Sequence, residues 1–549
     1  MPDVLLINVN FYGVPELQEP VGIEQLAGIM RAAGHTVELC DPTIDGDSLD
    51  VTVERILRGP PARVVGIGAF TDQAVTLRWV SEVASRLRAA GWEGHIIAGG
   101  YGATVRFRDY LAEIPALDAV VLGGGELTFP ELTARVTAGR DLEGVLGLAR
   151  RAGADVAWTR PRRVTDLDRL PPPARDLLKA RRAKYGPRTM AYILAGNGCP
   201  FQCTYCSIKS YLAFHDGPVY CKKSARVIAD EMEAIVTGLD VTNFTLLDDN
   251  FVVLDAEGIA RLRGLRDEIR RRGLKVKLLV MTRPDSITAE VLDILKEMGT
   301  ESIFIGVEAV HADDLAVYNR KGSQRVDSAL ELLQEKGFGL DLYSARRCRV
   351  GFIGFNPMSS LDTLEANVRF FARHRVPPKT LFQRVRIHRN TELRDIVARE
   401  GLLRHDPEQH MDYSEDVYRF KHPEVGVIYD LCQRLLREHY GMRNRVRRVE
   451  KCIALGGDDY PDISLAGCAR AIDERVVGFL GELVAAARAS AAAAAGAAAD
   501  VPAALEACYR RAAADIAAYY DRERLEAKVS ALERRLKADG RYMEADFHL

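Results

Sequence analysis

The N-terminal quarter of the chain alternates short apolar segments with longer stretches in which apolar residues recur every three or four positions. The apolar segments are residues 4–9, 37–39, 64–67, 96–98 and 119–122. Between the first two, Ile23, Leu26, Ala27 and Met30 fall on one face of a predicted helix. Strands separated by helices of this length pair in parallel through right-handed crossovers. Residues 1–140 are therefore predicted to form a doubly wound α/β domain, with its ligand beyond the carboxyl ends of the strands.

The middle of the chain repeats the alternation after a break. Residues 141–188 are predicted to be a domain linker, because 160–163 and 170–173 are too rich in proline and charge for regular structure. Six further strands are then predicted, at residues 191–195, 243–247, 276–281, 302–307, 350–355 and 381–387. With helical patterns between them, these strands predict a partial (β/α)6 barrel over residues 189–404, with functional groups at the carboxyl ends of its strands.

The remainder, residues 405–549, is predicted to be a helical C-terminal domain. Residues 485–499 are dominated by alanine and have helical propensity but little to bury. The residues Leu525, Val529, Leu532 and Leu536 form an apolar stripe at coiled-coil spacing. Because the stripe lasts less than three heptads, we expect it to pack on its own domain rather than to form a dimer seam.

Composition narrows the class of ligand and the compartment. The 549 residues carry 75 basic and 77 acidic side chains, mixed along the chain, for a formal net charge of -2. This balance gives no global field that favours nucleic acid or an anionic membrane, so a small-molecule substrate is expected. The first residues lack the features of a signal peptide, and no long apolar run follows, which predicts a cytoplasmic protein without a membrane span.

One group of cysteines has the spacing of a metal site. Cys199, Cys203 and Cys206 form C-x3-C-x2-C directly after the first predicted barrel strand. Three thiolates on one loop can hold three irons of a [4Fe–4S] cubane and leave the fourth iron open to a chelating amino-acid group. Structural zinc is the alternative, but it usually needs a fourth ligand nearby, which His215 and Cys221 do not supply at a suitable spacing. The other cysteines are predicted to be small buried residues: Cys40, Cys221, Cys348, Cys432, Cys452, Cys468 and Cys508.

The cysteine loop, with the aromatic Tyr205 before its third cysteine, resembles the signature of the radical S-adenosylmethionine (SAM) superfamily. The resemblance extends over about residues 190–400 and implies a cluster that cleaves SAM. Further segments at the ends of successive predicted strands match segments of the superfamily, in the same order along the chain.

The resemblance implies SAM contacts at these strand ends. Asp248 and Asp249 would receive the SAM amino group, where many members of the superfamily have Gly-Gly-Glu. Arg283 would contact the SAM carboxylate, and Glu308 its ribose or methionine part. Residues 351–357 resemble the segment near adenine. For each residue alone, an ordinary ion pair or turn is the alternative.

The N-terminal region resembles the cobalamin-binding domain that precedes the barrel in one large radical SAM subclass. Residues 19–22, 33–37, 99–104 and 124–129 match it, and residues 164–171 resemble the linker of that subclass. The implied cobalamin contacts are Thr71, Gly99, Gly100, Gly124, Gly125, Glu126 and Thr128. Glycines at such turns let backbone N–H groups approach a bulky cofactor. A degenerate domain that binds no cofactor is the alternative.

The chain departs from many cobalamin-binding modules in one respect. It lacks the D-x-H-x-x-G motif whose histidine ligates cobalt. His35 and His95 lie at predicted strand starts, away from the binding edge, and are expected to be ordinary histidines. We expect water or a non-histidine side chain from residues 70–73 at the lower face of the cobalt.

Together the two resemblances imply a cobalamin-dependent radical SAM methyltransferase. A 5′-deoxyadenosyl radical would abstract hydrogen from an unactivated carbon, and methylcobalamin would deliver the methyl group. The alternatives are a cyclase or rearrangement enzyme with the same cofactors, and, in another class, a cobalamin or cluster sensor. The implied partners are a small-molecule substrate of specialised metabolism, such as antibiotic biosynthesis, free or tethered to a carrier protein, and an electron donor such as flavodoxin or ferredoxin.

Overall fold

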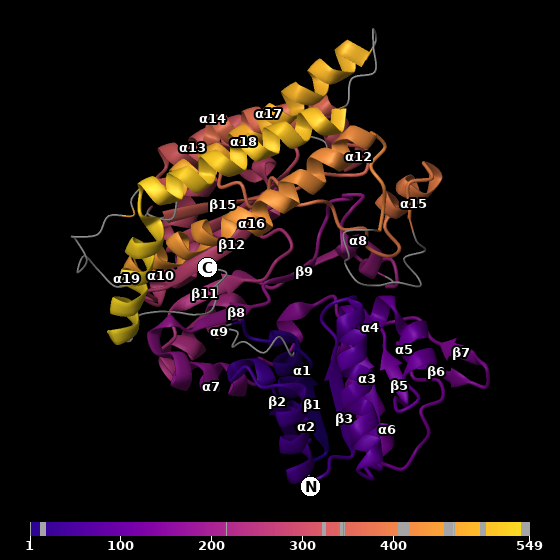
Figure 1. The fold of residues 1–549 in the computed structure, drawn as a ribbon. Coiled ribbons are helices and arrows are strands. Elements are labelled where there is room, and N and C mark those ends of the chain that lie inside the picture. Colours follow the sequence, from indigo (N-terminus) through magenta and orange to yellow (C-terminus); the bar gives the residue numbers. More distant parts are fainter. Residues whose placement is uncertain are drawn as a thin grey trace.

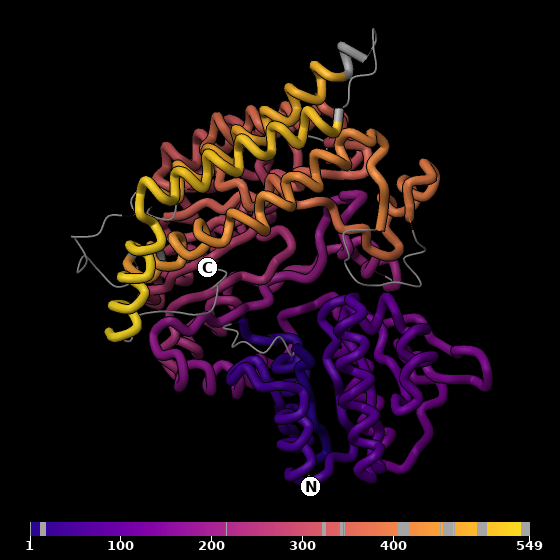
Figure 2. Tube along the Cα trace, viewed as in Figure 1, coloured from indigo at the N-terminus to yellow at the C-terminus, as the bar shows by residue number. Residues whose placement is uncertain are grey.

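A computed structural model of the chain describes residues 2–10, 18–215, 217–320, 325–340, 344, 346–404, 417–454, 465, 467–494 and 501–539. The chain forms an N-terminal sheet, a second sheet and a helical C-terminal region (Figure 1). The same trace, followed from indigo to yellow, places the long C-terminal helices on the side of the second sheet remote from the N-terminal domain (Figure 2). Within the described residues, no helix combines the length and apolarity that crossing a bilayer would require.

The first sheet has the strand order β2-β1-β3-β4-β5-β6-β7. Its parallel part consists of β1 (Val4–Asn8), β2 (Val37–Cys40), β3 (Val64–Gly68), β4 (His95–Gly99) and β5 (Ala119–Val121). Along β1, Leu5 and Ile7 face one core and Val4 and Leu6 face another, because alternate residues of a strand point to opposite faces. Helices on both faces bury these strands, which confirms the predicted α/β class.

Two groups of helices cover the first sheet. The core that contains Leu6 also takes residues from α1 (Val21–Ala32) and α6 (Gly125–Thr137). The core that contains Ile7 takes residues from α2 (Leu49–Arg58), α3 (Ala74–Ala89), α4 (Tyr101–Val105) and α5 (Phe107–Glu113). Helices α1 and α6 therefore both cover the same face of the first sheet.

The linker predicted at residues 141–188 contains regular structure outside its two proline-rich stretches, while residues 160–163 and 170–173 are irregular, as expected. Strands β6 (Leu148–Ala152) and β7 (Asp155–Trp158) form an antiparallel hairpin that extends the first sheet, and α7 (Asp176–Tyr185) follows. The charged residues of the hairpin are compatible with strand structure. Arg151, for example, donates hydrogen bonds to the carbonyl oxygens of Leu111 and Leu117, at 2.8 and 2.6 Å. An edge hairpin tolerates such residues, since one side of it remains near solvent.

The second sheet is parallel and has the order β14-β15-β13-β12-β11-β8. Its strands are β8 (Met190–Ile193), β11 (Asn243–Leu246), β12 (Lys277–Thr282), β13 (Thr300–Glu308), β14 (Phe338–Gly339) and β15 (Arg346–Phe352). The main crossover helices are α9 (Ala225–Leu239), α10 (Ala256–Arg271), α11 (Ala289–Glu297), α13 (Val326–Glu335) and α14 (Leu361–His374).

The prediction of a sheet strand at residues 381–387 is wrong. This segment makes only one parallel bridge, between Arg384 and Phe355, and the short β14 pairs with β15 instead. Leu381 and Phe382 are buried, and Gln433 donates a hydrogen bond to the carbonyl oxygen of Phe382. The apolar run thus reflects burial under the C-terminal helices rather than membership of the sheet.

The C-terminal region is helical, as expected. It contains α16 (Pro423–Ala454), α17 (Cys468–Ala494), α18 (Val501–Arg522) and α19 (Leu525–Ala538), preceded by α15 (Glu392–Arg399). The stripe from Leu525 to Leu536 is fully buried, and α19 packs against α16 and α18. The stripe therefore packs within the chain. Part of the alanine-rich stretch, residues 495–499, lies outside the described residues.

A buried ionic network joins the N-terminal domain to the second sheet. Arg175, in a left-handed conformation just before α7, contacts Glu19 at 2.6 Å and Glu231 of α9 at 3.2 Å. Glu19 also accepts the N–H of Tyr192 in β8, and Arg175 donates to the Tyr192 carbonyl, both at 2.9 Å. A second buried pair, Arg181 with Asp41, ties α7 to the end of β2. These contacts fix the first sheet against the start of the second.

Replacing Arg175 with Ala should lower the free energy of unfolding by about 3–5 kcal/mol, because buried carboxylates lose their cation. The side chains of Arg175 and Glu19 are 12% and 0% exposed. Urea titration of the cofactor-free protein measures the effect. The control is Arg31→Ala, whose pair with Asp176 is 39% and 48% exposed and should contribute less than about 1 kcal/mol. Equal effects of the two substitutions would contradict the prediction.

Candidate functional site

The carboxyl ends of the two sheets face each other across a cavity of about 400 Å³. From the N-terminal domain, the cavity is lined by residues at the ends of β1, β3, β4 and β5 and by the first turns of α1 and α6. From the second sheet it is lined by Leu194 and Leu247, which follow β8 and β11. Tyr211 of α8 (Ser207–Leu212) completes the wall. The cavity is thus shared by both domains.

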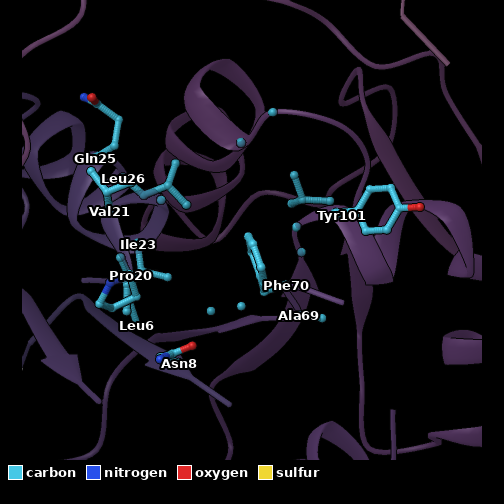
Figure 3. A pocket seen from close by; sticks show the side chains of 18 of the residues that line it. Leu6, Asn8, Pro20, Val21, Ile23, Gln25, Leu26, Ala69, Phe70 and Tyr101 are labelled. Carbon is cyan, nitrogen blue, oxygen red and sulfur yellow. The ribbon is translucent and has the colours of Figure 1, made fainter. Parts of the chain in front are cut away.

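The inner part of the cavity is apolar and lies between the sheet and helices α1 and α6 (Figure 3). Leu6, Ile23, Leu26 and Phe129 line this part. Gly66 is needed between them, because a Cβ there would lie 2.6 Å from the Leu6 side chain. An apolar slot of this kind suits the flat, largely apolar base of a large cofactor better than a phosphate.

Most of the predicted cobalamin-binding residues lie at this cavity. Gly99, Gly100, Gly124, Gly125 and Glu126 all line it. Gly100 has φ of +94°, and a Cβ there would approach the Ala69 carbonyl oxygen to 2.8 Å, so the turn needs glycine.

Two predicted contacts lie elsewhere. The hydroxyl of Thr71 is 2.7 Å from that of Thr76, and the hydroxyl of Thr128 donates to the Leu146 carbonyl at 2.8 Å. Neither threonine lines the cavity. Their side chains are directed by local hydrogen bonds that the sequence pattern does not reveal.

Aromatic residues also line the cavity, and among them Tyr211 belongs to no segment that the sequence analysis used. Tyr101, Phe129 and Tyr211 lie in its wall, and the rings of Tyr101 and Tyr211 are 5.9 Å apart. Phe70 is 68% exposed, and its ring stands in the cavity (Figure 3). None of the described lining residues is a histidine. His215 lies just behind the lining, because a Cβ on Gly123 would be 2.1 Å from its ring nitrogen, so the ligand at the lower face of the cobalt stays a prediction.

The three-cysteine loop begins after the short strand β9 (Gly196–Gly198), which pairs with β10 (Tyr220–Lys222), and ends at α8. Gly198 has φ of +88°, and a Cβ there would lie 2.1 Å from the Val219 carbonyl oxygen. Burial raises the pKa of the Cys199 thiol to about 12 and that of Cys206 to about 11. A strongly cationic partner is therefore needed to hold these sulfurs as thiolates.

Across the described residues, no three His, Cys, Asp or Glu side chains converge closely enough to share one metal ion. A cubane takes each thiolate on a different iron, so the three thiols of Cys199, Cys203 and Cys206 suit an iron–sulfur cluster as a donor set.

Asp248 is a buried carboxylate beside this loop that has no hydrogen-bond partner for either oxygen. It follows β11, and Arg261 is 3.7 Å from it. Burial raises its pKa to about 6. Gly196 leaves it room, because a Cβ there would lie 2.0 Å from the carboxylate oxygen. A buried carboxylate whose oxygens accept no hydrogen bond is suited to receive a cationic group. Asp249, the next residue, is exposed.

Arg283 lies at the end of β12, directly beside the loop. Its guanidinium donates hydrogen bonds to Asp285 at 2.9 and 3.0 Å and to the Cys203 sulfur at 3.5 Å. The same group stacks 3.8 Å from the centre of the Phe201 ring. Its contact with a SAM carboxylate remains a prediction, since these hydrogen bonds already engage the guanidinium.

Glu308 lies at the irregular end of β13, with φ of +67°. Burial raises its pKa, while the nearby Arg320 lowers it and Tyr205 hydrogen-bonds to it. Arg320 also reaches Cys203, at 4.0 Å. The sequence analysis missed Arg320, because it belongs to no segment used for the resemblance and reaches the loop only through the fold.

Comparisons with known proteins agree with this geometry. The family model "Radical SAM superfamily" matches residues 193–346, and "B12 binding domain" matches residues 9–133. A similar protein is an uncharacterized methyltransferase of Pyrococcus horikoshii, 27% identical over 64% of this chain and 72% of that protein. An anaerobic magnesium-protoporphyrin IX monomethyl ester cyclase of Rubrivivax gelatinosus is 27% identical over 61% of this chain and 60% of its own length. Other matched proteins bear the names of methylases, methyltransferases and cyclases.

The fold is also that of a solved structure. The cobalamin-dependent SAM radical enzyme OxsB, with aqua-cobalamin and SAM bound, superimposes with a TM-score of 0.76 and 16% identity, over 97% of this chain and 83% of that one. The chain therefore belongs to the radical SAM enzymes that carry a B12-binding domain, and [4Fe–4S], SAM and cobalamin are its cofactors.

Proposed function

We propose that the protein is a cobalamin-dependent radical SAM C-methyltransferase of a small molecule. The observation that carries this proposal is a cavity shared by the two sheets, lined by Gly100 and Gly124 on one side and by Leu194 and Leu247 on the other. A cofactor in the N-terminal domain would thus face the barrel. When bound, the cluster and SAM supply a radical that abstracts hydrogen, and cobalamin carries the methyl group.

The residues of the chain would bind and orient these groups. Cys199, Cys203 and Cys206 are proposed to hold the cluster, and Asp248 the ammonium group of SAM. Among the described residues, the buried oxygens of Asp248 accept no hydrogen bond and only Arg261 lies within ion-pair distance, at 3.7 Å. Gly99, Gly100, Gly124 and Gly125 would let the backbone approach cobalamin. The apolar slot near Phe129 would take the base of the cofactor's tail and exclude water from it.

The proposal extends to partners and setting. We propose a small-molecule substrate of specialised metabolism, free or tethered to a carrier protein, and a flavodoxin or ferredoxin as electron donor in the cytoplasm. The chain matches 72% of the length of one curated relative and 60% of the length of another. Because parts of both relatives have no counterpart in the match, the activity and the substrate of this chain are proposals.

A cyclase is the second candidate, because proteins named as cyclases are among the matched relatives. The same two domains and the same cavity would serve ring formation without methyl transfer. The two candidates differ in the fate of the SAM methyl group, which can be followed by an isotope label.

Replacing Cys203 with Ala should abolish the iron–sulfur cluster, because two thiolates do not retain a cubane. Iron and sulfide analysis after anaerobic reconstitution measures this. Cys221→Ala is the matched control: Cys221 is also buried and lies on the neighbouring strand β10, but it should not affect iron content. Full cluster content in the Cys203→Ala protein would remove this residue from the site.

SAM affinity should fall below about pH 6, because the Asp248 pKa is raised to about 6 and only the ionised carboxylate attracts an ammonium group. The fall should approach tenfold per pH unit at its steepest. Equilibrium binding between pH 5 and 7 tests this. Asp248→Asn should weaken binding roughly ten- to a hundredfold and remove the pH dependence. Asp240→Asn, at an exposed helix end, is the control. The same pH dependence in both variants would exclude Asp248.

One turnover should consume two SAM molecules, giving S-adenosylhomocysteine and 5′-deoxyadenosine, because methyl transfer and radical generation each require SAM. The experiment supplies SAM with a deuterated methyl group and candidate substrates, and mass spectrometry follows both SAM products and the label. A new product that carries the label is expected. A product without the label, formed together with 5′-deoxyadenosine, would favour the cyclase or rearrangement function instead.

A further inference from the structure

Two arginines converge on one sulfur of the cysteine loop. The Nη1 atom of Arg283 lies 3.5 Å from the sulfur of Cys203, and the Nη1 atom of Arg320 lies 4.0 Å from it. They approach from different elements, since Arg283 follows β12 and Arg320 follows α12 (Ala312–Val317). Cys203 and both arginines are buried. Their charges therefore act on the sulfur with little screening by water.

The other two thiols have a different environment. Cys199 is close to the backbone N–H of Phe201, and Cys206 to that of Ile208. A backbone N–H contributes a dipole, whereas a guanidinium contributes a full charge. The loop is therefore electrostatically asymmetric, with its cationic contacts at Cys203.

Each arginine is held in place independently of any bound cofactor. Arg283 is fixed by two hydrogen bonds to Asp285 and by stacking on Phe201. Arg320 is fixed by a hydrogen bond to the carbonyl oxygen of Gly306 in β13. Positioned charges of this kind need no rearrangement when the charge of a nearby group changes.

We propose that Arg283 and Arg320 are positioning residues that raise the reduction potential of the cluster through the Cys203 thiolate. One-electron reduction adds a negative charge to the cluster, and the electron comes from a low-potential protein donor such as a flavodoxin or ferredoxin. Asp285 pairs with Arg283, and Glu308 lies near Arg320. The guanidiniums are nevertheless the groups in contact with the sulfur, so they stabilise the reduced form more than the oxidised form. The proposal rests on the assignment of Cys203 as a cluster ligand, and it is independent of whether the enzyme transfers methyl groups.

The test is a redox titration of the reconstituted cluster, followed by electron paramagnetic resonance, without SAM or substrate. At a fixed solution potential, Arg320→Gln and Arg283→Gln should each lower the ratio of reduced to oxidised cluster at least tenfold, a shift of 59 mV to more negative potential. Arg320→Lys, which keeps the charge, should change the ratio less than threefold. Iron content is measured for every variant.

The control is Arg272→Gln, because the side chain of Arg272 is 7% exposed, close to the 9% of Arg283, but contacts Asp230 and Glu268 instead of the loop. Its potential should equal that of the unchanged protein. An unaltered ratio in both glutamine variants with full iron content would overturn the proposal. Loss of iron from both would also overturn it, since the arginines would then hold the cluster rather than set its potential.

Discussion

The position of the whole site depends on the buried ionic contacts between the N-terminal domain and the second sheet. Arg175 binds carboxylates from both domains, Glu19 before α1 and Glu231 on α9. Because Glu19 also accepts the N–H of Tyr192, the start of α1 is attached directly to β8. The attachment directs the carboxyl ends of both sheets toward a common space. Other contacts also join the two parts, such as Arg181 with Asp41 and the ring contact of Tyr101 with Tyr211, but in this network a single arginine binds carboxylates of both.

Glu19 is also part of the cavity it helps to create, since it lines the wall next to Pro20 and Val21. The same side chain therefore links domain orientation to the shape of the binding space. Doubly wound sheets place ligands at their carboxyl edges, and barrels do the same. Two such edges that face each other can bring two large cofactors together. One chain can therefore bind both the group that generates the radical and a second cofactor next to it.

The electrostatics of the site divide into two regions. Around Cys203, Arg283 and Arg320 lie near the sulfur, with Asp285 paired to the first and Glu308 near the second. Beside them, Asp248 is a buried carboxylate without a hydrogen-bond partner in the described structure. Both arrangements are costly for an empty protein, because buried charges lose hydration. An anionic cluster and a cationic amino group would offset these costs, so the pattern of charge matches the cofactors of the family.

Local sequence determined much of this protein. The strand and helix alternation follows from which residues are apolar, and the cysteine spacing and the order of strand-end segments indicate the cluster and SAM sites. The strand predicted at residues 381–387 is wrong because an apolar run also arises from burial outside a sheet, and the β6–β7 hairpin inside the linker was not predicted.

Tertiary structure alone decided the direction of individual side chains and the contacts between distant segments. Thr71 and Thr128 follow the correct strands but are held by other hydrogen bonds, and Arg320 reaches Cys203 across 117 residues of chain. The domain junction at Arg175 is equally non-local. A sequence pattern reports which face of an element is buried, whereas these contacts depend on how separate elements pack.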